Sequence, residues 1–470
     1  TRLGTPPFEV FKLFDPKNNQ INPDKFIEKL GSDVSEQFLL LNLLPKNLAD
    51  LYLSGEIALL HLNYWALKPL SIYIDTETIM DYLIKEHTDL KNKINKKVGY
   101  TELIILFSDL LYYLKKFYSE DLVLGNFNNQ FLSKFPKAIS SDFSLLTSRI
   151  VRFNNKDDKT KSSITLEFNY NGCPAEQESI DEAFLKSINT KSKNQILPFF
   201  IFEYSQNDKI LNLVVNNLKN NAILYDKFNS NIFNSSVIQI PNAQTNQVIL
   251  DKILINLHNI SVEANQNDEK FLELLQEKIN AVFELFNHKE KLVQKKLNSL
   301  KQWNFIISNL MNTNANDIIK NALKSISFFG LNEAIFTHCG IELDKTENSE
   351  SFALKILNFM KKIIIEKNNK NGRNFILSQP HYDTYLENSF CNGRTQHNQK
   401  ISGYTSNLIR NESKLSINKK IALFKKFQNI FDRGSLFTLE TIKEEKNSLK
   451  IIKSLIESKI STVLLKECIQ

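Results

Sequence analysis

Short apolar runs alternate with amphipathic helical patterns along most of the chain, and this alternation restricts the fold more than any other feature. The segment "SSITLEFNY" (162–170) alternates apolar and polar residues, as a half-buried strand does. By contrast, "ILPFFIFEY" (196–204) and "KILINLHNI" (252–260) are almost continuously apolar and predict buried strands. Helical patterns separate these strands, so the sequence favours an α/β fold over segregated helical and sheet regions.

The helical segments indicate which surface they bury. The helical pattern at 34–55 is interrupted at Pro45 and ends at Gly55, a residue type suited to the end of a helix. The segment "YTELIILFSDLLYYLKKFY" (100–118) is apolar almost all round, which predicts a buried helix. A long helix beginning near residue 268 places six apolar residues on one face: Phe271, Leu275, Ile279, Val282, Phe286 and Val293.

Size and charge exclude several classes of protein. The chain has 470 residues, 42% of them hydrophobic and 24% charged, which is typical of a globular protein. The net charge of +7 is spread along the chain without an Arg-rich block or a basic stripe interleaved with aromatics, so we expect no specific nucleic-acid partner. No apolar run reaches the ~18 residues of a membrane span, and no signal peptide opens the sequence. The expected location is the cytoplasm.

The four cysteines do not predict a metal site or a disulfide framework. Cys173, Cys339, Cys391 and Cys468 are far apart and form no C-x-x-C pair. Cys339 follows His338, but such a dipeptide is more often part of the packing than a reactive pair. No cluster of titratable residues with metal-ligand spacing stands out, so we expect no metal and no cofactor.

One histidine lies in an otherwise apolar run. In "SGEIALLHLNYWALKPLSIYID" (54–75) a turn precedes an apolar strand that contains His61. This imidazole could carry protons in an active site. A core histidine that is hydrogen-bonded to backbone is the commoner arrangement, and we favour it here.

Several segments, taken in order, carry a resemblance to one enzyme family. They include "LLPKNLADLYLSGEIALLHLNYW", "YSEDLVLGNFNNQFLSKF" and "FFGLNEAIFTHCGIEL", followed by "FILSQP", "GYTSNLI" and "IFDRGSLFTLE". Their order and spacing resemble those of the anaerobic (class III) ribonucleoside-triphosphate reductases, which are glycyl-radical enzymes. The resemblance spans nearly the whole chain, although no single motif decides it.

The resemblance implies a fold and an assembly. The expected fold is a ten-stranded α/β barrel ringed by helices, built from two five-stranded parallel half-sheets joined antiparallel, with the active site inside. We expect one barrel domain over 1–470, in which 1–150 is helix-rich and contains the first barrel strand and 151–470 forms the rest. The family's tendency to dimerise predicts a homo-oligomer or another protein partner.

The chemistry of the family requires a cysteine on a loop through the barrel centre, and this sequence lacks it. The resemblance places that loop between "ILYDKFNSN" and "KILINLHNI", where the chain reads "IFNSSVIQIPNAQTNQVIL". A thiyl radical needs sulfur, so neither Ser nor Val can replace the cysteine. The chain also stops at "LKECIQ", about where the family continues to its zinc-binding cysteines and radical glycine. We therefore expect the C-terminal zinc and glycyl-radical region to be absent from this chain.

Other positions differ from the family pattern in the same direction. Ala58 and Leu60 stand where the family's strand has histidines, and His61 stands where it has aspartate. Glu120 and Asp121 replace two glycines of the family's F-S-G-G-Q segment. These substitutions predict that the scaffold is kept while the chemistry is lost.

The phosphate-binding turn of the family is only partly preserved. Gln379 is followed by Pro380-His381-Tyr382-Asp383-Thr384, which keeps a carboxylate and a hydroxyl. Gln379, Asp383 and Thr384 are therefore our candidates for contact with a phosphate or nucleotide, provided that a helix N-terminus follows. A plain turn is the commoner explanation of such a segment.

The sequence thus predicts a catalytically inactive relative of these reductases. It would have a structural or regulatory role and no catalytic residues, and it could retain binding of a nucleoside triphosphate. One alternative is the large fragment of a split, active reductase whose radical glycine is on another chain. Another is a divergent member with different small-molecule chemistry, for which no residues stand out. A cysteine thiol at the centre of the barrel would exclude the hypothesis that the protein is catalytically inactive.

Overall fold

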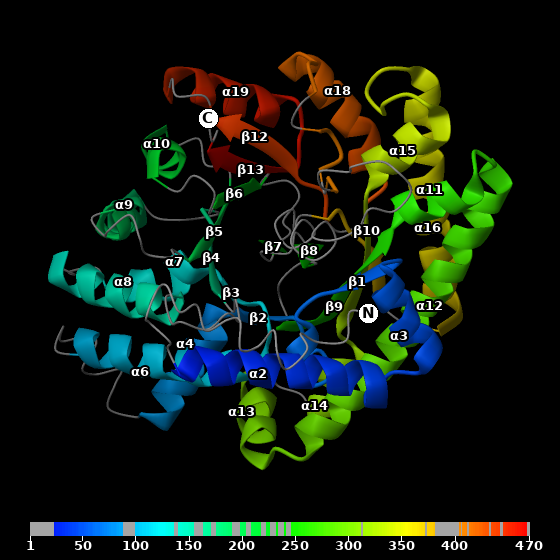
Figure 1. Cartoon of the computed structure of the whole chain (residues 1–470). Helices are drawn as coiled ribbons and strands as arrows, with labels where there is room; N and C mark the ends of the chain where they lie inside the picture. The colour runs from blue at the N-terminus through cyan, green and yellow to red at the C-terminus, as the bar shows by residue number, and fades with distance from the viewer. Residues whose placement is uncertain are drawn as a thin grey trace.

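Figure 1 shows the fold in a computed structural model of the chain. It describes residues 23–87, 99–135, 140–154, 163–170, 175–189, 198–203, 208–217, 222–225, 232–233, 239–240, 246–311, 314–371, 374–380, 404–405, 407–410, 413–431, 434–441 and 445–467. Within these residues, no helix is both long and apolar enough to cross a membrane.

Ten strands follow one another in a ring-like sheet, as predicted (Figure 1). Five strands of the first half are mutually parallel: β2 (Ser71–Asp75), β3 (Asp121–Gly125), β4 (Ser163–Phe168), β5 (Phe199–Glu203) and β6 (Ala222–Tyr225). The second half contains β9 (Gln247–Asn256), β10 (Leu323–Phe329), β11 (Phe375–Leu377), β12 (Phe437–Thr441) and β13 (Thr462–Glu467).

The two halves join antiparallel at both junctions. β9 pairs with β2, and β13 pairs with β6, while β9–β10–β11 and β12–β13 are parallel among themselves. The expected barrel of two parallel half-sheets is therefore confirmed. The strands are buried on both sides because helices cover the outside and side chains fill the inside, which explains their nearly continuous apolar sequences.

The first apolar run does not form one long barrel strand. β1 (Ile57–Leu59) pairs antiparallel with β9 beside the main path of the sheet. His61 then adopts a left-handed conformation with φ 46°, and the 3-10 turn η2 (Leu62–Tyr64) follows. The ring strand proper is β2, after Pro69. The expectation of a single strand failed here because the turn lies in a mostly apolar run and contains no glycine or proline between Leu60 and Lys68.

Helices surround the ring. On the first half they are α4 (Thr76–Glu86), α6 (Tyr100–Leu114), η3 (Lys115–Phe117), α7 (Phe127–Gln130), η4 (Leu132–Lys134), α8 (Ser140–Asn154), α9 (Ala175–Asn189) and α10 (Asp208–Asn217). On the second half they are α11 (Leu257–Ala264), α12 (Asp268–Asn298), α13 (Lys301–Met311), α14 (Ala315–Lys320), α15 (Leu331–Cys339), α16 (Glu347–Asn371), α18 (Ile417–Gln428) and α19 (Glu445–Glu457).

The N-terminal helices confirm the predicted interruption at Pro45 and the predicted end at Gly55. α2 (Pro23–Phe38) continues into the π-helical turn η1 (Leu39–Leu43), and α3 (Lys46–Ser54) resumes after Pro45. Gly55 ends α3 in the left-handed conformation, with φ 77°. Glycine adopts the left-handed conformation without steric strain because it has no Cβ to clash.

The core forms an outer layer between strands and helices and a smaller cluster inside the ring. The six residues predicted on one face of α12 are all buried in the outer layer. A buried ion pair also joins α12 to the sheet, with 3.0 Å between Lys289 Nζ and Asp251 Oδ2 of β9. Burial lowers the pKa of Lys289 and raises that of Asp251, while each charge partly restores the other.

Candidate functional site

Two short strands between β6 and β9 lie in the middle of the ring in Figure 1. They are β7 (Ile232–Phe233) and β8 (Gln239–Ile240), which form an antiparallel pair. This is the position expected for the central loop. Residues 226–246, which connect β6 to β9, contain no cysteine.

The one cysteine that the structure describes lies elsewhere. Cys339 is the last residue of α15, on the outside of the ring, and its side chain is exposed. Partial burial and the nearby Asp268 carboxylate raise the pKa of its thiol, which disfavours the thiolate. Cys173, Cys391 and Cys468 lie outside the described residues.

β1 presents apolar side chains to the interior. Ala58 and Leu60 belong to the inner cluster, together with residues such as Val123 and Leu254. Neither can exchange a proton or bind a sugar hydroxyl. His61 is partly buried at the turn after β1 and is not part of this inner cluster.

The inner face of the first half-sheet carries buried carboxylates that the sequence analysis did not select. Glu167 on β4 accepts the backbone N–H of Asn126 at 2.8 Å and the hydroxyl of Tyr225 at 2.9 Å. Glu203 on β5 accepts the backbone N–H of Tyr170 at 2.8 Å. Each carboxylate therefore accepts a hydrogen bond from a backbone N–H just after the end of the neighbouring strand.

Burial is the dominant influence on Glu167. It raises the pKa of this carboxyl to about 7, and nearby Asp75 and Glu203 act in the same direction. The Tyr73 hydroxyl is buried close to this group and has no hydrogen-bond partner within the described part of the chain. Gly125 makes room for it, since a Cβ at that position would overlap the hydroxyl.

Asp121, at one of the two positions where the family has glycine, is a structural acceptor. Its side chain accepts hydrogen bonds from Ser71 of β2 and from Thr165 of β4, the latter at 2.8 Å. It thus links three adjacent strands through their inward side chains. A period of two within "SSITLEF" places Thr165 and Glu167 on the same face, and this signal could have revealed the row of polar residues.

Gln379 lies where the two ends of the sheet meet. β11 and β12 form no strand pair, but Gln379 donates its backbone N–H to Gly434 at 2.7 Å. Its side-chain amide also exchanges two hydrogen bonds with the backbone of Leu436, at 3.0 and 3.1 Å. Both polar atoms of the side chain therefore bind backbone, and only 2% of the residue is exposed.

A buried lysine also reaches Gln379. Lys252 on β9 donates from Nζ to the Gln379 carbonyl at 2.6 Å. Burial lowers the pKa of this amine to about 7, against the influence of Glu120, which favours the charged form. Asp383 and Thr384, the other candidates for phosphate contact, lie outside the described residues.

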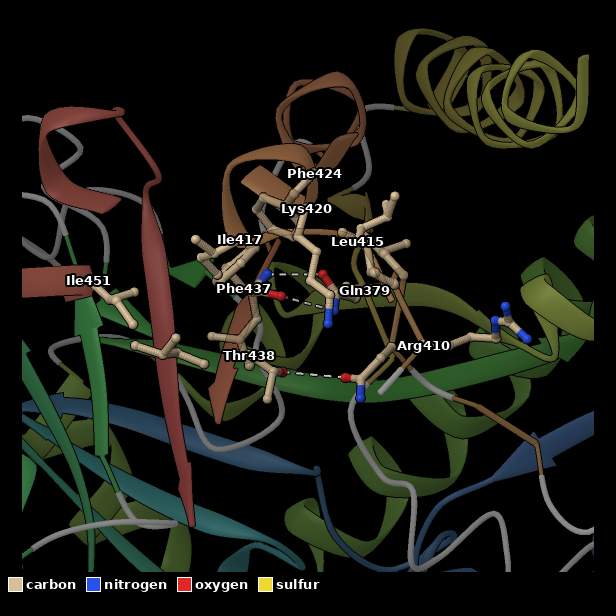
Figure 2. A pocket seen from close by; sticks show the side chains of 14 residues that line it. Gln379, Arg410, Leu415, Ile417, Lys420, Phe424, Phe437, Thr438 and Ile451 are labelled. Carbon is tan, nitrogen blue, oxygen red and sulfur yellow. Dashed lines mark hydrogen bonds between the residues drawn. The ribbon is translucent and has the colours of Figure 1, made fainter. Parts of the chain in front are cut away.

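A pocket of about 300 Å³ opens beside Gln379 (Figure 2). Its walls come from β12, α18, α19, residues 407–410 and Leu415, and they are mostly apolar, with Phe424 and Phe437 among them. Lys420 of α18 is the basic side chain directed toward Gln379 in Figure 2. Arg410 also borders the pocket but forms ion pairs with Glu342 and Asp344 at 2.6 and 3.3 Å.

Two segments that carry the resemblance contact each other next to this pocket. Asn332, after β10, donates to the Thr405 hydroxyl at 3.1 Å and to the Asn407 carbonyl at 3.0 Å. Glu333 accepts from the backbone and hydroxyl of Thr405. Hydrogen bonds therefore hold the "GLNE" segment against Thr405 and Asn407 of the "GYTSN" segment. Within the described ranges, no group of three or more His, Cys, Asp or Glu side chains could hold a metal ion.

Comparisons with solved structures agree with this architecture. The anaerobic ribonucleotide reductase from Thermotoga maritima with citrate in the active site superposes with a TM-score of 0.73 at 14% identity, covering 97% of this chain and 93% of that chain. The same enzyme in complex with dATP and CTP gives 0.74 at 14% identity, over 97% of this chain and 85% of that one. At these identities the likeness establishes the fold alone.

Comparison with family models assigns the chain more directly. No curated protein matches the sequence. The model of a family described as anaerobic ribonucleoside-triphosphate reductase matches residues 177–464, which is more than half of the chain. The matched region runs from α9 to β13 and includes the central segment, the Gln379 junction and the pocket. The chain belongs to the anaerobic ribonucleoside-triphosphate reductase family.

Proposed function

We propose that this chain is a catalytically inactive member of its family that binds a nucleoside triphosphate and has a structural or regulatory role. The observation that carries the proposal is the central segment, residues 226–246, which contains no cysteine. Ribonucleotide reduction through a thiyl radical needs a sulfur atom beside the ribose. Serine and asparagine, which the segment does contain, form no comparably accessible radical.

The surroundings of the central segment support the loss of chemistry. Ala58 and Leu60 belong to the apolar cluster inside the ring. The carboxylates of the opposite wall accept hydrogen bonds from backbone and hydroxyl groups, which is how buried polar groups are retained in a scaffold. Cys339 is separated from this interior because it lies on an outer helix.

The pocket beside Gln379 is the proposed nucleotide site. Its volume is near the lower end of small-molecule pockets, roughly 300–1,000 Å³, and its apolar walls suit a base. Lys420 would meet the phosphates. The chain runs directly from Gln379 into residues 380–384, so Asp383 and Thr384 complete the proposed phosphate contacts, while the Gln379 side chain holds the junction. The reductase from Thermotoga maritima that was solved with dATP and CTP provides a precedent for such ligands.

The regulatory role would be exerted through a partner. We propose a homo-oligomer or a complex with another protein, in the cytoplasm, in which bound nucleotide reports the supply of DNA precursors. In the split-enzyme alternative, the same barrel would be active with a radical-bearing chain, and a cysteine of this chain would have to reach the ribose.

Binding is tested by calorimetric titration of the purified chain with ATP and CTP. We expect saturable binding of at least one of them and a loss of tenfold or more in affinity for Lys420→Ala, because the phosphates lose a charge. Lys419→Ala is the matched control, since Lys419 is an exposed neighbour on the same helix that does not line the pocket. Absence of binding to any nucleoside triphosphate would leave only a structural role.

A further inference from the structure

The pocket beside Gln379 offers few polar side chains for a ligand to contact. Among the described residues that line it, three carry uncharged polar side chains: Gln379, Asn407 and Thr438. Both polar atoms of the Gln379 side chain already bind the backbone of Leu436. Side-chain hydrogen bonds to an uncharged part of a ligand would therefore come from Asn407 and Thr438.

Asn407 and Thr438 form a loose polar pair in the wall of the pocket. The Thr438 hydroxyl lies 3.4 Å from Asn407 Oδ1 (Figure 2), and both residues are half-buried. Hydrogen bonds donated by hydroxyl groups are normally about 2.5–3.0 Å long, so this contact is weak. A ligand atom can therefore replace it with little loss. Between them, a carboxamide and a hydroxyl supply both hydrogen-bond donors and acceptors.

This polar pair suits the edge of a nucleobase. Cytosine and uracil each carry a hydrogen-bond donor next to an acceptor on the ring, and a carboxamide beside a hydroxyl can bind both. Adenine and guanine have the same kind of edge. Contacts to Asn407 and Thr438 therefore favour a base over an apolar ring, whereas the choice between one-ring and two-ring bases depends on space.

The pocket has room for a small ring. Its volume of about 300 Å³ has to hold a base together with its ribose. Phe424 and Phe437 form two of its walls, with ring centroids 5.3 Å apart and ring planes at 85°. Both residues are buried, and widening the pocket on this side would break their contact. A pyrimidine can lie against these walls, whereas the second ring of a purine would have to displace them.

Lys420 determines which end of the ligand meets the polar pair. In Figure 2, Lys420 points into the pocket from α18, and Thr438 lies at the lower end of the pocket on β12. The other charged side chain among the described lining residues, Arg410, is held in ion pairs. A nucleotide whose phosphates contact Lys420 would thus direct its base toward Thr438 and Asn407.

We infer that this pocket selects pyrimidine nucleoside triphosphates, and that Asn407 and Thr438 bind the edge of the pyrimidine ring. The inference rests on the nucleotide site proposed above and adds which bases that site accepts. The two aromatic walls exclude purines by size, and the polar pair holds the smaller ring in one orientation. Lys420 contributes affinity for any triphosphate but does not distinguish one base from another.

Base preference is measured by calorimetric titration of the purified chain with CTP, UTP, ATP and GTP. We expect CTP and UTP to bind at least tenfold more tightly than ATP and GTP, because even one extra methylene in a tight pocket changes binding roughly 10–200-fold. Equal affinities for all four, or tighter binding of a purine nucleotide, would overturn the inference and leave the proposed function standing. Absence of binding by any of the four would overturn both.

A second titration separates the two ends of the site with inorganic triphosphate, which has no base. Thr438→Val removes the hydroxyl at nearly constant volume. It should weaken CTP binding about tenfold through the loss of one hydrogen bond, without changing the affinity for inorganic triphosphate. Lys420→Ala should weaken the binding of both ligands.

Thr438→Ser restores the hydroxyl and should recover most of the CTP affinity, and thermal melting checks that each variant is folded. A Thr438→Val chain that binds CTP as tightly as the natural sequence would overturn the inference. The same holds if this variant loses affinity for CTP and for inorganic triphosphate equally, because the hydroxyl would then not contact the base.

Discussion

The inner and outer faces of the ring hold their buried charges in different ways. On the outer face, Asp251 is paired with Lys289 of α12, so a full negative charge meets a full positive one. On the inner face, Glu167 is held by a backbone N–H and a tyrosine hydroxyl, and burial pushes its pKa to about 7. Asp251 also accepts the backbone N–H of Lys252 at 2.8 Å, but the opposite charge beside it is that of Lys289. The outer carboxylate therefore relies on an opposite charge, whereas the inner carboxyl can lose its charge without losing its place.

The largest expected effect is on the outer face. Lys289→Ala leaves the Asp251 carboxylate buried and uncompensated, which costs about 3–5 kcal/mol of unfolding free energy. Lys291→Ala, at an exposed position on the same helix, should cost less than about 0.5 kcal/mol. Urea unfolding of both variants measures the difference. Equal losses would show that the pair does not hold α12 to the sheet.

A smaller loss is expected where the ends of the sheet meet. Gln379→Ala leaves the N–H and C=O of Leu436 without the side-chain partners they now have. We expect a loss of about 2–3 kcal/mol, within the range for buried groups left unsatisfied. Gln247→Ala removes bonds that are partly exposed and should cost under about 1 kcal/mol. Urea unfolding of both variants measures the two losses of unfolding free energy. Similar losses would mean that the Gln379 side chain does not join the two ends of the sheet.

The buried carboxyl of Glu167 on the inner face should make the free energy of unfolding depend on pH. The pKa of Glu167 rises from 4.5 to about 7 on folding, so the folded state holds the proton more tightly. Stability from this group is fully present below pH 4.5 and is lost as pH rises through 7. Glu167→Gln should remove that decline, which amounts to about 2.5 kcal/mol between pH 5 and pH 8. Thermal melting of both proteins from pH 5 to 8 tests this, and parallel pH profiles would contradict it.

The smallest effect lies outside the ring. Gly31→Ala adds a methyl group that meets nothing within 4 Å, so the helix of the monomer should gain about 0.5–1 kcal/mol. Melting at a concentration too low for association isolates this gain. A destabilised monomer would show that Gly31 has a role within one chain.

Apolar runs and helical periods predicted alternating strands and helices because they record burial directly. The resemblance to the reductase family, and not this pattern, predicted the ring and its two parallel halves. It also located the central segment and its lack of cysteine. It did not predict that Gln379 would bind the backbone of Leu436, because these residues meet only through tertiary structure. Glu167 and Lys252 were missed for a related reason: a single charged residue in an apolar strand can face either side. The left-handed turn at His61, after the end of β1, was also not predicted, because no glycine or proline marks it.

The central claim is that this barrel binds a ribonucleoside triphosphate without reducing it. The most direct test is one anaerobic incubation of the chain with isotopically labelled CTP and a thiol reductant, with and without an activated glycyl-radical protein of the family. Bound and free nucleotide are then separated by chromatography. We predict that CTP is retained on the chain and recovered unchanged in both samples. Formation of dCTP that requires this chain, and disappears when its cysteines are replaced by serine, would contradict the account.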